Sequence, residues 1–412
     1  MNRNREQHPA RRRFRVGPGL LVTAAFIGPG TVVTASKAGA EFGCGLLWTV
    51  LFACVGTVIL QSLAARLGIV TGQGLGEAIR RSFSNSVFLR PAVALVIGAI
   101  GIGNAAYQTG NLTGAVKGIS VVTGGDSHVW VIALAGLTIA LILLGRYRVL
   151  HRVLVGLVAL LSLSFLWSAA NALPSAGRLL QGLVVPRVGA DHLTLVLGMI
   201  GTTIVPYNLF LHASGAAAAW RGEDFERAWH QCRWDTLLSI GLGGLVTASI
   251  LLTASAAFFD TGTPWTGIDQ IADQLRPTLG AGSGPAFAIG LFAAGLTSSI
   301  TAPLATAYAV CGCLGWDARP SQRRFQTIAI AVVLIGAASA LRWGSSPAST
   351  ILFAQVANGL LLPMIAVFLL VAVRKASASG QANLSLAGYV AAWIVVAGVA
   401  LLGVWRIVGA LG

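Results

Sequence analysis

Gly28-Pro29-Gly30-Thr31 interrupts an apolar stretch that runs from Gly19 to Val33 and is long enough to form most of a membrane span. A proline inside a helix removes one backbone hydrogen bond and clashes with the carbonyl group four residues earlier, while glycine allows backbone angles that other residues resist. In lipid, backbone groups freed in this way are tolerated only where protein buries them or where they line a wet cavity. The stretch therefore predicts either a helix that is broken at a substrate site or a simple proline kink.

The composition of the chain indicates a polytopic membrane protein. Hydrophobic residues make up 55% of its 412 residues and charged residues only 10%, which excludes an ordinary soluble enzyme. We find eleven stretches that are long and apolar enough to be spans, and we expect an all-α integral membrane protein with eleven transmembrane helices. Their approximate limits are 17–40, 44–65, 91–120, 128–145, 150–173, 193–220, 234–259, 284–312, 325–342, 346–373 and 387–411.

The distribution of basic residues predicts how the chain is oriented. A net charge of +15 would suggest nucleic-acid binding in a soluble protein. With a cytoplasmic N-terminus, however, 21 of the 28 Lys and Arg residues fall on the cytoplasmic side, as the positive-inside rule requires. We therefore expect no nucleic-acid partner but a lipid bilayer, namely a bacterial-type inner or plasma membrane, with the C-terminus outside. Residues 1–16 are expected to be a basic cytoplasmic tail and not a signal peptide.

Several motifs along the chain resemble those of one transporter family. In the first two spans they are Ala38-Gly39-Ala40-Glu41-Phe42-Gly43, Leu46-Leu47-Trp48 and Ala65-Arg66-Leu67-Gly68-Ile69-Val70-Thr71-Gly72. Later motifs are Gly201-Thr202-Thr203-Ile204-Val205-Pro206-Tyr207-Asn208-Leu209-Phe210-Leu211-His212, Arg233 with Asp235, and Gln355-Val356 with Pro363. From about residue 17 to 375 the chain is identified as a member of the Nramp family, whose characterised members carry divalent metals with protons.

The resemblance implies a fold. It is the leucine-transporter-like fold of the APC superfamily, a five-plus-five inverted repeat with an eleventh helix appended. Pro29 in span one and Pro206 in span six would break the first helix of each half, and such a pair of interrupted helices points to a midplane site. The implied division is a tail at 1–16, a first repeat at 17–174 with helices 1–5, a second repeat at 190–375 with helices 6–10, and helix 11 at 385–412.

The family's metal ligands are replaced in this chain. The aspartate and asparagine of its first-helix motif Asp-Pro-Gly-Asn correspond to Gly28 and Thr31, and its sixth-helix methionine and histidine correspond to Val205 and Tyr207. No acidic residue lies at the centre of a predicted span, so a divalent cation there would lack a balancing carboxylate. We therefore predict no metal-ligating side chain, although Mg²⁺ can keep part of its water shell. The five cysteines also lack the spacing of a metal site.

Backbone groups and neutral side chains remain at the two breaks. The amides that open the second half of span one suit a carboxylate, because they lie at the positive end of a helix dipole. The carbonyl groups that close its first half suit an ammonium group. The alternative for the threonines is that each hydroxyl group bonds only to the backbone of its own helix, as Ser and Thr side chains in membrane helices often do. The predicted substrate-binding residues are Ala25, Gly28, Gly30, Thr31, Thr202, Val205, Tyr207 and Asn208.

Polar residues in spans three and eight form a second group of candidates. Asn104, Gln108 and Asn111 share one face of span three, which would point either to a cavity or to a neighbouring helix. We list Tyr107, Gln108 and Asn111 as the candidate cavity residues, while the hydroxyl groups of 297–301 suit either a helix interface or an ion site.

Two residues are candidates for coupling. His212 matches a family histidine linked to proton handling, and histidine changes charge near neutral pH. Its other interpretation is a neutral, hydrogen-bonded group between helices. Asp235, near the end of span seven, is the alternative proton carrier.

These observations predict a secondary active transporter without a cofactor. An enzyme is not expected, since no nucleophile, base and acid occur together in the predicted spans. The first hypothesis for the substrate is a small organic zwitterion such as an amino acid, because the metal ligands are missing. The alternative is a proton-coupled transporter of a divalent metal ion, Mg²⁺ or Mn²⁺. A third is a sensor built on a transporter scaffold. The coupling ion would be H⁺ or Na⁺.

Overall fold

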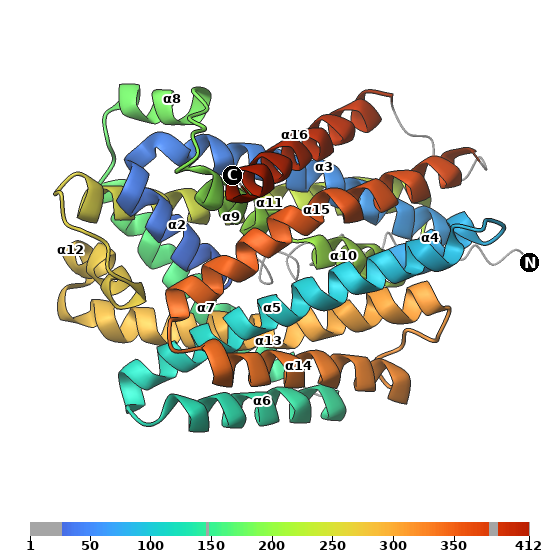
Figure 1. Ribbon diagram of the computed structural model, residues 1–412, viewed down its shortest axis with the longest axis horizontal. Helices are drawn as coiled ribbons and strands as arrows, with labels where there is room; N and C mark the ends of the chain where they lie inside the picture. The colour runs from blue at the N-terminus through green and yellow to red at the C-terminus, as the bar shows by residue number, and fades with distance from the viewer. Residues whose placement is uncertain (1–26, 146–147, 379–385, 412) are drawn as a thin grey trace, which may run out of the picture.

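The computed structural model describes residues 27–145, 148–378 and 386–411 (Figure 1). This part of the chain contains helices and no strand. The helices of its first half are α2 (Pro29–Phe42), η1 (Gly43–Leu46), α3 (Leu47–Thr71), α4 (Leu75–Phe83), α5 (Leu89–Thr123), α6 (Ser127–Leu144), α7 (Arg148–Asn171) and α8 (Ala176–Val184). Those of its second half are α9 (Leu193–Thr203), α10 (Pro206–Ala219), α11 (Phe225–Ala254), the π-helical turn η2 (Ser255–Phe259), η3 (Ile268–Leu275), α12 (Arg276–Leu279), η4 (Gly280–Gly282), α13 (Ser283–Leu314), α14 (Arg323–Trp343), α15 (Pro347–Ala378) and α16 (Leu386–Leu411).

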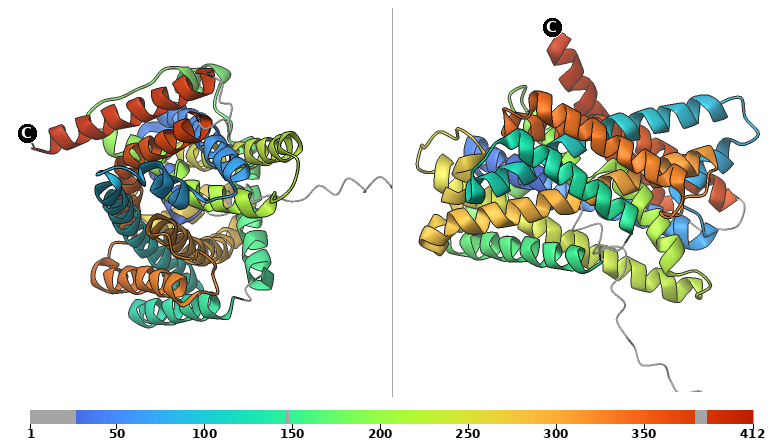
Figure 2. Two further views of the ribbon diagram at one scale, coloured as in Figure 1. Left: turned by 90° about the vertical axis from the view of Figure 1, so that its right-hand side faces the viewer. Right: turned by 90° about the horizontal axis from the view of Figure 1, so that it is seen from below.

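The long helices have the length and composition of membrane spans. Ten helical stretches among the described residues meet these criteria. One of them, Pro29–Thr71, joins α2, η1 and α3, and it contains the second half of the first predicted span together with the whole of the second. The long helices form an elongated bundle, with α6 and α14 on one side and α16 on the opposite side (Figures 1 and 2). Outer helices expose large apolar side chains such as Ile132, Leu334 and Leu401, as a surface that faces lipid requires.

The second predicted helix break lies at its proline, and in span one the described helix begins at its proline. Residues 17–26, which would form the first half of span one, lie outside the described residues. α2 begins at Pro29, directly after the non-helical Ile27 and Gly28. In span six, Ile204 and Val205 separate α9 from α10, which begins at Pro206. Proline suits the first position of a helix because its fixed φ angle is helical and no N–H group is lost from the hydrogen-bond ladder.

Two residues on the polar face of span three contact neighbouring helices. Asn104 donates from Nδ2 to Ala302 O at 3.3 Å and to Thr306 Oγ1 at 2.6 Å. Gln108 lies against α14, where a Cβ atom at Gly336 would overlap its side chain. These two residues of the polar face are therefore in helix-packing contacts, as polar groups between membrane helices commonly are.

Charged residues gather at the two ends of the bundle. At the end that contains α4 (Figure 1), Arg80 donates to Cys313 O and Lys375 donates to Ser82 O. At the end that contains α8 and α12, Lys117 pairs with Asp269 at 2.7 Å. A cavity of about 650 Å³ lies beside this ion pair.

Candidate functional site

The two helix breaks meet through a pair of hydroxyl groups. Thr31 Oγ1, in the first turn of α2, lies 2.9 Å from Thr202 Oγ1, in the last turn of α9, and either group can be the donor. Both side chains are fully buried. The structure therefore brings together residues that are 171 positions apart in the chain and that were predicted to share one site.

The first break presents the N-terminus of a helix without a side-chain cap. Gly28 is the N-cap of α2, and its carbonyl group accepts a hydrogen bond from the N–H group of Val32 at 3.2 Å. Gly28 has no side chain that could cap this terminus, and no acidic residue lies in its first turn. Backbone N–H groups at such a terminus carry partial positive charge and attract anions or water. Ala25, which was also predicted to bind substrate, lies outside the described residues.

The second break presents a carbonyl group that the helix cannot use. In a continuous helix the carbonyl of Thr202 would accept from the N–H group of residue 206, but Pro206 has none. By contrast, Thr203 O accepts a hydrogen bond from Thr57 Oγ1 at 3.3 Å, and Ile200 O accepts from Ile204 N at 2.8 Å. The carbonyl oxygen of Thr202 thus has no donor at the usual helical position. It belongs to the residue whose hydroxyl group joins the two breaks, and it suits a cation or an N–H donor.

Side chains from other helices fill the space beside the glycines of the first break. An ideal Cβ atom at Gly28 would lie 3.0 Å from Ser298 Oγ of α13 and 3.9 Å from Tyr107 Oη of α5. A Cβ atom at Gly30 would overlap the carboxamide of Gln355 of α15. Sequence reasoning used Gln355 only as a family motif. The signal that would have identified it is an amide side chain in the middle of an apolar span.

Unpaired amide groups mark the same region. Asn208, in the first turn of α10, is 1% exposed, yet neither atom of its carboxamide has a hydrogen-bond partner among the described residues. Gln355 Oε1 and Asn358 Nδ2 on α15 are likewise unpaired within that part of the chain. A buried polar group without a partner costs about 1–3 kcal/mol. Three such residues on the helices that form and flank the breaks indicate that a ligand or ordered water completes the site.

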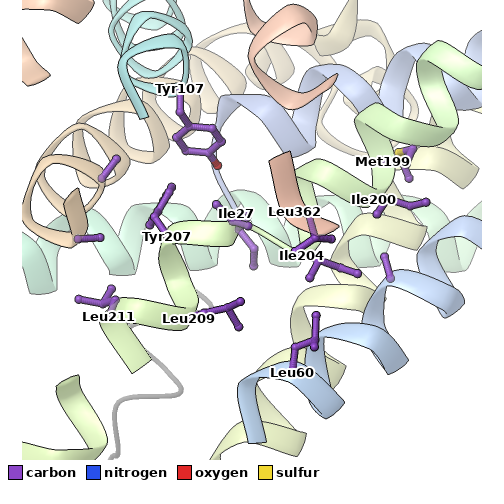
Figure 3. Close-up of a cluster of buried hydrophobic side chains, with 14 of the residues drawn as sticks. Ile27, Leu60, Tyr107, Met199, Ile200, Ile204, Tyr207, Leu209, Leu211 and Leu362 are labelled. Carbon is purple, nitrogen blue, oxygen red and sulfur yellow. The ribbon is translucent and has the colours of Figure 1, made fainter. Parts of the chain in front are cut away.

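Two tyrosines cover the breaks. The rings of Tyr107 and Tyr207 are in edge-to-face contact, with centroids 5.3 Å apart and an interplanar angle of 70°. Figure 3 shows Tyr107 above Ile27, with its hydroxyl group directed towards the non-helical chain. Ile204 and Val205 contribute apolar side chains that are 1% exposed.

The three candidate cavity residues of α5 lie in different surroundings. Of the three candidate cavity residues, Tyr107 lies at the breaks, Gln108 lies against α14, and Asn111 is buried on α5 with Nδ2 unpaired among the described residues.

His212 is held between two helices. It is fully buried on α10, with Nδ1 2.7 Å from Gln61 Oε1 of α3 and Nε2 3.9 Å from Cys232 Sγ of α11. Since a carboxamide oxygen only accepts, Nδ1 carries the hydrogen in this arrangement. Asp235 is half-buried on α11.

The site is electrically neutral in its side chains. No group of three or more His, Cys, Asp or Glu residues that could hold a metal ion occurs among the described residues. The oxygens available at the breaks come from hydroxyl, carboxamide and carbonyl groups. These are hard ligands of the kind that Ca²⁺, Mg²⁺ and Mn²⁺ accept, but without the negative charge that usually strengthens their binding.

The chain is similar to known metal transporters along almost its whole length. Residues 19–409 match the family described as natural resistance-associated macrophage protein-like (Nramp). The divalent metal cation transporter MntH of Klebsiella pneumoniae (strain 342) is 30% identical over 401 residues, which cover 96% of this chain and 94% of that relative. MntH of Bradyrhizobium diazoefficiens is 31% identical over 394 residues, which cover 92% and 86%.

Solved structures show the same fold at lower identity. A manganese transporter of Eremococcus coleocola has a TM-score of 0.67 at 22% identity, covering 96% of this chain and 94% of that one. Mhp1, a nucleobase-cation-symport-1 family transporter, has a TM-score of 0.58 at 15% identity, covering 96% and 90%. These likenesses show the leucine-transporter-like inverted-repeat fold, as predicted from the sequence.

Proposed function

The chain belongs to the Nramp family of membrane transporters, and from that premise we propose that it carries a divalent metal ion through the site between α2 and the α9–α10 break. It is a multi-pass membrane protein and not an enzyme. The relatives that match over most of its length are named as divalent metal cation transporters. The alternative hypothesis from the sequence is therefore favoured over the first one, since amino acid transport has no support among these relatives.

The observation that carries the proposal is the unpaired carboxamide of Asn208. Its Oδ1 atom is an oxygen ligand without a partner among the described residues, in the first turn of α10. The freed carbonyl of Thr202 and the hydroxyl group of Thr31 supply further oxygens from the other two helix ends. A cation held by these groups gives the Oδ1 atom of Asn208 the partner that it lacks among the described residues.

The neutral ligands determine which metal suits the site. Without a carboxylate, no attraction to a negative ligand offsets the free energy of removing water from a divalent ion. The ion therefore keeps much of its water. Mg²⁺ loses its water reluctantly and is usually bound with several water molecules. Val205 provides no sulfur atom, so the site lacks the soft ligand that favours thiophilic metals. We propose weak binding of hydrated Mg²⁺ or Mn²⁺.

A small organic zwitterion remains the second candidate, on one observation. The uncapped N-terminus of α2 and the freed carbonyl of Thr202 lie on either side of the Thr31–Thr202 hydroxyl pair. A carboxylate suits the first and an ammonium group suits the second. Such a ligand needs no charged side chain.

Topology and coupling complete the proposal. We propose that the α4 end faces the cytoplasm, since basic residues lie there and the positive-inside rule assigns such residues to the cytoplasmic side. In this proposal the N-terminus is inside, the C-terminus is outside, and the two repeats span 17–174 and 190–375. Proton coupling follows the family, and the candidate carriers are His212 and Asp235.

Uptake into proteoliposomes tests the proposal and separates the candidates. Asn208→Leu removes the oxygen at nearly constant volume and should abolish uptake of Mg²⁺ and Mn²⁺. Asn208→Asp adds a carboxylate and should strengthen the binding of both ions. These opposite effects control for general damage to the fold. Saturable uptake of an amino acid, together with no uptake of either metal by the wild-type protein, would refute the proposal in favour of the zwitterion.

A further inference from the structure

The backbone does not require glycine at position 28. Gly28 is extended, with φ −111° and ψ −175°, which lies in the β region that most residues adopt. A Cβ atom added there would lie 3.0 Å from Ser298 Oγ, but 3.8 Å from Ser298 Cβ and 3.9 Å from Tyr107 Oη, which are ordinary contacts. Among the described residues, the hydroxyl group of Ser298 on α13 is the nearest atom to a side chain at this position, and it would have to shift by a few tenths of an ångström to admit one.

The hydroxyl groups of three neighbouring residues on α13 can be compared. Thr297 Oγ1 donates to Ala293 O at 2.7 Å, and Thr301 Oγ1 donates to Thr297 O at 2.9 Å, so these two hydroxyl groups bond within their own helix. The hydroxyl group of Ser298 lies beside the break, where position 28 has no side chain of its own. Ser298 is fully buried.

We propose that Ser298 is a specificity-determining residue, whose hydroxyl oxygen takes the place of a side chain at position 28 and contacts the transported cation there. This inference rests on the proposed function. Gly28 and Ser298 act as one unit, because a side chain at position 28 and the hydroxyl group of Ser298 would crowd the same space. The unit supplies a neutral oxygen where an acidic residue at position 28 would supply a charged one. A neutral oxygen suits a cation that keeps part of its water shell, so the pair limits discrimination between Mn²⁺ and Mg²⁺.

An exchange of the hydroxyl group between the two helices tests the unit. Ser298→Ala removes the ligand oxygen and should raise the KM for Mg²⁺ uptake by about tenfold or more, as loss of a supporting metal contact does. Gly28→Ser alone should impair uptake, since its Cβ atom would press on Ser298 Oγ. The double variant Gly28→Ser with Ser298→Ala has room for the Cβ atom and returns the oxygen from α2, and it should recover most of the wild-type KM.

The ratio of Mn²⁺ to Mg²⁺ uptake tells a ligand role of Ser298 from a packing role, because a change in packing alone would leave this ratio unchanged. Gly28→Asp should tighten Mn²⁺ binding only when Ser298→Ala makes room for the carboxylate. Thr297→Val, which removes a hydroxyl group bonded within its own helix, is the matched control and should leave the Mn²⁺ to Mg²⁺ ratio unchanged. If Gly28→Ser fails to insert into the membrane, Ser298→Thr against Ser298→Ala still tests the oxygen, because Thr retains it.

The outcomes separate this inference from the proposed function. A wild-type protein that takes up neither ion refutes the proposed function. A wild-type protein that takes up Mg²⁺ or Mn²⁺, combined with a Ser298→Ala variant of unchanged KM and selectivity, overturns the inference alone. Additive loss in the exchange variant, without recovery, would show that the two positions do not act as one unit and would also overturn it.

Discussion

The two helix breaks share a proline at the start of the following helix and differ in what surrounds it. At the first, Gly28 and Gly30 contribute no side chain, and Ser298 and Gln355 from two other helices occupy the adjoining space. At the second, Ile204 and Val205 contribute apolar side chains and a carbonyl group is freed. The first break thus offers backbone N–H donors together with side chains from α13 and α15, and the second offers a backbone carbonyl acceptor.

This difference explains how a site can exist without the family's charged ligand. The charge is missing at the first break because position 28 has no side chain, and the space is then filled from α13. The chemistry of that break is therefore determined by long-range packing, whereas the chemistry of the second break follows from Pro206 alone. Changes at the first break should consequently have larger effects on transport.

The largest effect is expected for Gly28→Val. Its Cβ atom would press on Ser298 Oγ at 3.0 Å, and two further methyl groups would enter the break. Uptake should be abolished while the protein still inserts and elutes as a single species in size-exclusion chromatography. Normal uptake by this variant would show that the break is only a kink.

A smaller effect is expected for the hydroxyl bridge between the breaks. Thr31→Val and Thr202→Val each remove one partner of the 2.9 Å contact, and each should lower uptake by about tenfold, the equivalent of roughly 1.4 kcal/mol. Because the two groups share one interaction, the double variant should be little worse than either single variant. Thr247→Val, whose hydroxyl group bonds to Gly243 O within α11 at 2.9 Å, is the control. Fully additive losses would contradict a direct bridge.

His212 lies away from both breaks and should contribute mainly to stability. His212→Ala leaves Gln61 unsatisfied, so the free energy of unfolding should fall by about 1–3 kcal/mol. Uptake driven by a pH gradient should persist, which would leave Asp235 as the remaining candidate carrier. A thermal melt and a gradient-driven uptake assay on the same preparation measure both effects. Loss of the pH response with an unchanged melt would instead assign proton transfer to His212.

The smallest effect is expected at a helix terminus that has a cap, in contrast to α2. Asp126 Oδ1 accepts a hydrogen bond from the N–H group of His128 at 2.8 Å before α6, and this bond lowers the pKa of Asp126. A lowered carboxyl pKa stabilises the folded state above the unfolded-state value of about 4, and this stability is lost as the pH falls through the folded value.

Asp126→Ala should therefore lower the melting temperature slightly at pH 7 and lose that difference near pH 3, with no change in uptake. Asp126→Asn keeps an acceptor at every pH and serves as the control. If Asp126→Ala changed uptake, the capped terminus of α6 would contribute to transport as well as to stability. That result would contradict the contrast that we draw with the N-terminus of α2.

Local features of the sequence predicted the fold well. The predicted limits 91–120 and 284–312 lie within three residues of the ends of α5 and α13, and both breaks follow directly from proline chemistry. The family motifs supplied the order of the helices. These features depend on a few neighbouring residues, so they can be recognised without knowledge of tertiary contacts.

The side chains that surround the breaks could not be predicted in the same way. Ser298 and Gln355 lie hundreds of positions from Gly28 and Gly30, and which face of α13 or α15 meets α2 depends on the packing of the whole bundle. The shared face of Asn104 and Gln108 was predicted, but its two neighbours, α13 and α14, were not. The spacing of polar residues along a helix shows which of them share a face, but it does not show which neighbouring helix that face contacts.

Calorimetric titration of the purified protein with Mn²⁺ and with Mg²⁺ tests the central claim most directly. A site built from neutral oxygens should bind Mn²⁺ no more tightly than about 1 mM, the range of weak oxygen-ligand sites, with Mg²⁺ within about tenfold of it. Asn208→Leu should remove the heat of binding for both ions. Micromolar affinity for Mn²⁺ with strong preference over Mg²⁺ would require a charged or sulfur ligand and would contradict a neutral site.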